Sequence, residues 1–243
     1  GSAGGFLDGS SSSFNFSGAM ADARIDVRTG AQVNTRGGAL ALVSPIVNTE
    51  AGSTMTASDG GNVLYGSASS YKVSFRPTST NDLDLLSFEV ATGADGAGGY
   101  GGTAYLQGAT SGNRVFVSVV SQTGLVSQLV APGAITATSV ATDEAGGILL
   151  TTNRNIVNGA ASTSAVANSG TSSFSTGNLT GPDVSLIATG TLLMNGAIDA
   201  AGGNVRLFSG TGNIHQNGPK ITANTLSASA TGYVELGAGG SGT

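Results

Sequence analysis

The stretch GTLLMNG at residues 190–196 recurs in altered form as GNIHQNG at residues 212–218, so position 212 repeats position 190 with an offset of 22. Two further pairs of segments recur in the same way, with offsets of 21 and 23: VSL at 184–186 with VRL at 205–207, and IDA at 198–200 with ITA at 221–223. A short period that drifts slightly from one repeat to the next is typical of a stacked repeat protein. The carboxy-terminal third of the chain therefore predicts a solenoid.

Each of these repeats holds two or three short apolar strands separated by Gly, Asn or Asp, which are turn residues. We therefore predict an all-β fold, a right-handed parallel β-helix in which one repeat of about 21–23 residues makes one coil. Coils stack at roughly 4.8 Å, so like residues form inward ladders, such as Val184 over Val205 over Leu226. Ser, Thr, Asn and Arg occupy the outward positions.

The composition suits a thin core built from many short strands. Glycine supplies 40 of the 243 residues, charged residues make up only 9 %, and apolar residues 39 %. A disordered chain usually combines low hydrophobicity with high net charge. The apolar content, which falls in short regular bursts, argues against disorder here.

The repeat period predicts that the chain is divided into three parts. Residues 1–75 and 141–243 read as β-helix coils, the second part continuing to a cut or flexible end. Residues 76–140 break the period, and we expect an aperiodic β insertion or long strands there, packed on one flank with a glycine-rich loop at residues 93–102.

Several classes of function are disfavoured by charge and patterning. The net charge is −5 and no basic run occurs, so we expect no nucleic-acid partner. The apolar runs are far shorter than the roughly 20 residues of a membrane-spanning helix. No secretory signal peptide is visible at the start, and both Gly-rich ends read as cuts through a longer polymer. Cysteine is absent, which is compatible with export.

The segments GGALALVSPIVN at residues 37–48 and GSTMTASDGGNVLYG at residues 52–66 resemble successive coils of filamentous-haemagglutinin-like exoproteins, the passengers of two-partner secretion. Residues 14–33 are similar to the preceding coils of that family, and residues 202–228 to its generic repeat. The resemblance covers roughly residues 14–75 and 181–236. The Asn-Pro-Asn-Gly-type motifs of the family's secretion segment do not occur in this sequence.

The resemblance implies a long β-helical fibre on the bacterial cell surface or secreted from it. It implies an outer-membrane secretion partner barrel, and adhesion to a glycan or protein on a host or neighbouring cell. Adhesin and toxin-carrier roles are both usual in the family.

The residues that could carry chemistry are few. His215 is the only histidine, and with no cysteine to join it we expect no zinc site. Paired carboxylates, Asp82 with Asp84 and Asp143 with Glu144, are candidates for a glycosidase or lyase, although solvated turn charges are the simpler interpretation. The glycine-rich loop offers a calcium ion only one carboxylate, Asp95. We therefore expect no catalytic residue, no metal and no cofactor.

Aromatic residues gather around the aperiodic segment, and on the flank of a β-helix they could stack sugars or a partner's side chains. Covering the apolar side of the helix is the alternative role. The candidate binding surface consists of Tyr65, Tyr71, Phe75, Tyr100 and Tyr105.

The sequence is compatible with three functions. The first is a structural and adhesive exoprotein segment, a rigid spacer that presents binding loops. The second is a fibre subunit whose open ends self-associate through exposed strand edges. The third is a carbohydrate-active β-helix enzyme, either a polysaccharide lyase or a glycosidase.

Overall fold

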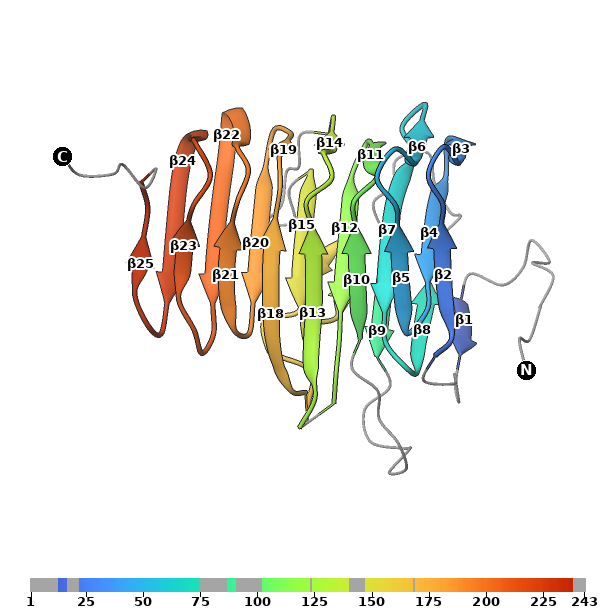
Figure 1. Cartoon of the computed structure of the whole chain (residues 1–243), viewed down its shortest axis with the longest axis horizontal. Helices are drawn as coiled ribbons and strands as arrows, with labels where there is room; N and C mark the ends of the chain where they lie inside the picture. Colours follow the sequence, from blue (N-terminus) through green and yellow to red (C-terminus); the bar gives the residue numbers. More distant parts are fainter. Residues whose placement is uncertain are drawn as a thin grey trace.

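The computed structural model describes residues 13–16, 22–74, 87–90, 102–122, 124–139, 147–167 and 169–237. This part of the chain is all-β and contains no helix (Figure 1). Its strands lie side by side along the long axis, from the amino-terminal strands at one end to the carboxy-terminal strands at the other (Figure 1). They form two parallel sheets and one antiparallel sheet.

The first parallel sheet, sheet I, has eight strands. In spatial order these are β2 (Arg24–Val27), β5 (Ile46–Thr49), β10 (Thr103–Leu106), β13 (Val126–Ala131), β18 (Thr171–Thr176), β21 (Thr191–Met194), β23 (Ile214–Gln216) and β25 (Val234–Glu235).

The second parallel sheet, sheet II, has twelve strands in two arms. Arm one contains β3 (Gln32–Arg36), β6 (Thr54–Ser58), β11 (Ala109–Gly112), β14 (Ile135–Ala137) and β19 (Leu179–Thr180). Arm two contains β4 (Ala39–Val43), β7 (Asn62–Ser67), β12 (Val115–Val119), β15 (Ile148–Thr152) and β20 (Val184–Ala188). The arms meet at two long strands, β22 (Ile198–Ser209) and β24 (Ile221–Ala230).

The chain visits sheet I, arm one and arm two in rotation, as in β2-β3-β4, β5-β6-β7 and β10-β11-β12. Each strand therefore pairs in parallel with the corresponding strand of the preceding and following passages. Val184 pairs with Val205 and Val205 with Leu226, which confirms the predicted ladder. Leu192 pairs with Ile214, and Ile198 pairs with Ile221. These pairs have the predicted offsets of 22 and 23 residues.

The five-stranded antiparallel sheet, called the flank sheet here, interrupts this rotation. It consists of β1 (Ser13–Phe16), β8 (Tyr71–Ser74), β9 (Ser87–Val90), β16 (Ile156–Val157) and β17 (Ala160–Ala161). β1 precedes the first strand of the parallel sheets, and the other four strands come from segments inserted between passages. Residues far apart in sequence therefore meet in the flank sheet, such as Ile156 and Phe88.

The predicted boundaries of the aperiodic segment, residues 76–140, need correction. Strands β10 to β14, which span residues 103–137, lie in the parallel sheets, and Thr103 pairs with both Ile46 and Gln128. Ile46 is much farther from Thr103 along the chain than Gln128 is, because the segment containing β8 and β9 lies between β7 and β10. Inserted segments thus hide the repeat period in the sequence but leave the parallel pairing of the strands intact.

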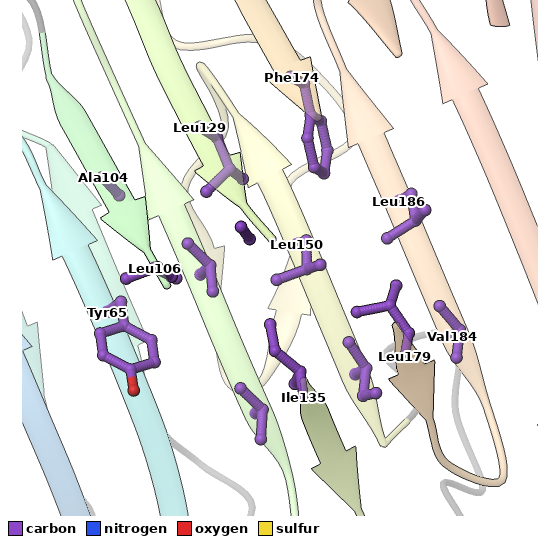
Figure 2. Close-up of a cluster of buried hydrophobic side chains, with 14 of the residues drawn as sticks. Tyr65, Ala104, Leu106, Leu129, Ile135, Leu150, Phe174, Leu179, Val184 and Leu186 are labelled. Carbon is purple, nitrogen blue, oxygen red and sulfur yellow. The ribbon is translucent and has the colours of Figure 1, made fainter. Parts of the chain in front are cut away.

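The main core lies between the inward faces of sheets I and II. Figure 2 shows Ala104, Leu129 and Phe174 from sheet I and Leu150 and Leu186 from sheet II within one cluster of side chains. These side chains are at most 1 % exposed. Burial of apolar surface at roughly 25 cal/mol per Å² is the main force that holds such faces together.

A second core lies between the flank sheet and the outward face of arm two. Leu64, Phe116 and Leu149, on β7, β12 and β15, pack there with Phe88 of β9. Phe88 lies so close to Gly66 that a Cβ atom on residue 66 would come within 2.5 Å of its ring. Both faces of arm two are therefore covered along β7, β12, β15 and β20, which are buried at every position.

One buried polar side chain, that of Asn153, ties the turns after β15 to neighbouring passages. Its backbone adopts a φ of 55°, and its side chain is fully buried. The amide oxygen accepts hydrogen bonds from the Ser121 backbone N–H (3.1 Å) and the Ser127 hydroxyl. The amide nitrogen donates to the Gly170 carbonyl (2.8 Å) and to Thr189 Oγ1 (2.9 Å). Asn tolerates positive φ better than most residues, so this residue suits both requirements.

We predict that Asn153→Ala lowers the free energy of unfolding by about 3 kcal/mol, because it leaves several buried groups without partners and places Ala at positive φ. Urea denaturation measures the change. Asn195→Ala, at an exposed position, is the matched control and should cost no more than about 0.5 kcal/mol. Equal losses in the two variants would contradict the role assigned to Asn153.

Candidate binding surface

The structure separates the aromatic residues of the predicted binding surface. Tyr65 is fully buried in the main core, where its hydroxyl lies 2.7 Å from Thr110 Oγ1. Tyr71 belongs to the second core and is 6 % exposed. Tyr105 lies on the outward face of sheet I and is 36 % exposed. Phe75 and Tyr100 lie outside the described residues.

Tyr65 and Tyr71 therefore help to hold the molecule together. The Tyr71 hydroxyl donates to the Val43 carbonyl (3.0 Å), and its ring packs against Phe16 and Phe88 at centroid distances of 4.9 and 5.6 Å. Burial raises the pKa of Tyr71 to about 12. Burial also raises the pKa of Tyr65, partly opposed by its hydrogen bond with Thr110. Of the three described tyrosines in the predicted binding surface, only Tyr105 offers its ring to a partner.

A shallow hollow of about 510 Å³ surrounds Tyr105 on sheet I. We call this region the Tyr105 surface, and its residues come from four adjacent strands, β2, β5, β10 and β13, and the turn after β10: Arg24, Ile46, Asn48, Thr103, Tyr105, Gln107 and Gln128. The alternation of side chains along a strand explains the arrangement, because the neighbouring residues Val47, Ala104 and Leu129 point to the opposite face, into the main core.

Hydrogen bonds order the side chains of the Tyr105 surface. The Tyr105 hydroxyl donates to Gln128 Oε1 (2.8 Å). At the other side, Arg24 and the amide of Asn48 donate to the Asp26 carboxylate at 2.6 and 3.1 Å. These hydrogen bonds, that of Arg24 first, lower the pKa of Asp26. The surface thus combines one aromatic ring with several amides and one arginine paired to a carboxylate.

This combination suits a ligand with both an apolar face and hydroxyl groups. An aromatic ring offers a flat apolar platform, and amides both donate and accept hydrogen bonds. The described residues offer no comparable arrangement for metal chemistry, because they contain no group of three or more His, Cys, Asp or Glu that could hold an ion.

His215 sits at the carboxy-terminal end of sheet I. Its Nδ1 lies 3.1 Å from Glu235 Oε2, and its Nε2 lies 2.7 Å from the Tyr233 hydroxyl. Both ring nitrogens therefore have partners on the chain. The candidate carboxylates Asp82, Asp84, Asp95, Asp143 and Glu144 lie outside the described residues, so their roles remain predictions.

Sequence reasoning missed Asn48, Gln107 and Gln128 as neighbours of Tyr105. Tyr105 pairs with Asn48 and Val130 across the strands, and Gln128 pairs with Thr103. The signal that could have found Asn48 and Gln128 was the outward position of each residue on its strand, whereas Gln107 lies in the turn after β10. That signal required the register, which the insertion between β7 and β10 concealed.

The chain matches no protein-family model, no curated protein and no solved structure. Within the described residues, no helix is long and apolar enough to cross a membrane.

We predict that alkaline pH destabilises the protein partly through Tyr71. The unfolded side chain ionises near pH 10, whereas the folded one keeps its proton to about pH 12, so ionisation favours the unfolded state. The free energy of unfolding, measured with urea from pH 9 to 11.5, should fall above about pH 10. Tyr71→Phe should show a shallower fall, by up to about 1.4 kcal/mol per pH unit. Identical slopes would refute this contribution.

Proposed function

We propose that sheets I and II together form a right-handed parallel β-helix, with arm one, arm two and sheet I as its three faces. The rotation of the chain through these faces supports this interpretation, as do the regular parallel registers of the carboxy-terminal part. The flank sheet is then an extra-helical element packed on one face.

On this fold we propose a structural and adhesive function: the chain is a segment of a large secreted bacterial surface exoprotein, a rigid fibre that presents binding surfaces. The sequence resemblance to filamentous-haemagglutinin-like exoproteins at residues 37–66 supports the exoprotein part. Export would then use an outer-membrane secretion partner barrel, with the fibre secreted or held at the cell surface.

The observation that carries the adhesive part is the Tyr105 surface. A rod built from backbone ladders holds outward side chains at fixed spacing, so Tyr105, Asn48 and Gln128 are preorganised before any partner arrives. Its shallow shape is better suited to a sugar on a host or neighbouring cell than to a deeply enclosed small substrate. We therefore propose a surface glycan as its partner and a non-enzymatic role.

The test is glycan-array binding by the purified chain, followed by titration of the best ligand. We predict that Tyr105→Ala weakens binding by about tenfold or more, since a central aromatic contact typically contributes about 2 kcal/mol and about 1.4 kcal/mol is a factor of ten. Tyr233→Ala is the control. Tyr233 is 52 % exposed but is not among the residues of the Tyr105 surface, so this variant should leave binding unchanged. Undiminished binding by Tyr105→Ala would reject this surface as the adhesive site.

A second candidate function is a fibre subunit that stacks end to end. The terminal strands β24 and β25 leave inward-type apolar side chains uncovered: Leu226, which pairs with buried Val205, is 43 % exposed, and Val234, which pairs with buried Ile214, is 41 % exposed. Another copy stacked on this end would cover them and pair the open strand edges.

If this function holds, negative-stain microscopy at rising concentration should show filaments that Val234→Asp abolishes. Val126→Asp places the same charge at a similarly exposed valine (46 %) on the side of sheet I and should not affect assembly. Monomeric particles at every concentration would exclude the fibre-subunit function.

A further inference from the structure

A small hollow of about 120 Å³ lies between the outward face of sheet II and the end of the flank sheet. Leu149, Ile187 and Phe208, from β15, β20 and β22, supply apolar walls. Residues 160–163, which contain β17 and the two residues after it, form another wall. Arg154 and Arg206 also line the hollow, and no Asp or Glu is among its described lining residues.

Arg154 is unusual because its guanidinium is enclosed by the protein and has no carboxylate partner among the hydrogen bonds and ion pairs of the described residues. Only 8 % of the residue is exposed. Nη1 donates to the carbonyl oxygens of Ser162 (2.7 Å) and Thr163 (2.5 Å), and the guanidinium carbon lies 5.2 Å from the centre of the Phe208 ring. Nε is buried and has no hydrogen-bond partner.

This arrangement leaves the buried positive charge of Arg154 without a compensating carboxylate among the described residues. A buried charge is costly unless it is paired and fully hydrogen-bonded. Burial first, and then the positive charge of Arg206, lower the pKa of Arg154, although an arginine stays protonated in proteins. An anion in the hollow would offset both effects, since it would lie beside the Arg154 guanidinium and near the positive charge of Arg206.

We propose that this hollow is a binding site for a small organic oxyanion of the carboxylate class, held by Arg154 at its base and by Arg206 at its mouth. Arginine guanidinium groups bind carboxylates through charge-assisted hydrogen bonds. Leu149, Ile187 and Phe208 suit the carbon atoms that carry the carboxylate, and the hollow is smaller than the roughly 300 Å³ of ordinary ligand pockets. This inference rests on the hollow alone and does not depend on the adhesive function.

Arg154 also has a structural role, since it connects the start of the β15–β16 turn to residues 162 and 163. A test by removal of Arg154 alone would confuse the two roles. Arg206 separates them, because it is exposed on the outward face of β22 and lines the hollow. Arg36, exposed on β3 in arm one, is not among the residues that line the hollow, and provides a control with the same loss of charge.

The experiment is an NMR titration of the ¹⁵N-labelled chain with sodium acetate, sodium glucuronate and sodium sulfate, each at constant ionic strength balanced with chloride. We expect saturable shifts of the amides of residues 160–163 with acetate, at millimolar concentration. Arg206→Gln should weaken this binding by about tenfold, the effect of one lost charge-assisted hydrogen bond, and Arg36→Gln should not change it.

Glucuronate binding tighter than acetate would support the site and identify acidic sugars as the source of the carboxylate. Acetate binding with weak glucuronate binding would support the site for a smaller carboxylate. Sulfate binding as tight as acetate would overturn the assignment to carboxylates. Shifts that do not saturate, or that Arg206→Gln leaves unchanged, would overturn the site itself.

Discussion

The structure depends on one constraint: each strand of the parallel sheets must pair, in register, with the corresponding strand of the passages before and after it. Parallel pairing at about 4.8 Å stacks backbone on backbone, and turns must stack as closely as strands. Gly203 shows the consequence, because a Cβ atom there would overlap the Pro182 carbonyl oxygen of the preceding passage. Close stacking of turns, rather than flexibility, accounts for glycine at such a position.

The same constraint explains why a chain with so few charges can form two cores. Backbone ladders satisfy the peptide groups of sheet II from within, so its strands need no polar outer face. Leu64 and Phe116 can therefore point away from the main core, provided that another layer covers them. The flank sheet supplies that layer, and Phe88 fills the space above Gly66 that any side chain at residue 66 would occupy.

The sequence was sufficient to predict an all-β structure with parallel strand ladders where passages follow one another without insertion. The Val184–Val205–Leu226 ladder is such a case, because equal spacing makes the stacking visible. It was insufficient where segments are inserted, as between β7 and β10, and so residues 103–137 were assigned to the wrong part of the structure. The roles of Asn153 and Arg154 were also hidden: Asn153 has a partner in a distant segment, Ser121, and Arg154 is enclosed only because the chain turns back through β16 and β17 to bring Ser162 to it.

Tyr65 and Tyr105 show how register, rather than residue type, decides a tyrosine's role in this architecture. Tyr65 shares its strand face with Val63 and faces the main core, where Thr110 is its hydroxyl partner. Tyr105 alternates with Ala104 and Leu106, both buried, and so must point outward. Inward positions are constrained by the residues above and below them, whereas outward positions are free to vary. A ligand-binding function is therefore most easily acquired on the outward face of sheet I and beside the flank sheet, which are the places where Tyr105 and Arg154 lie.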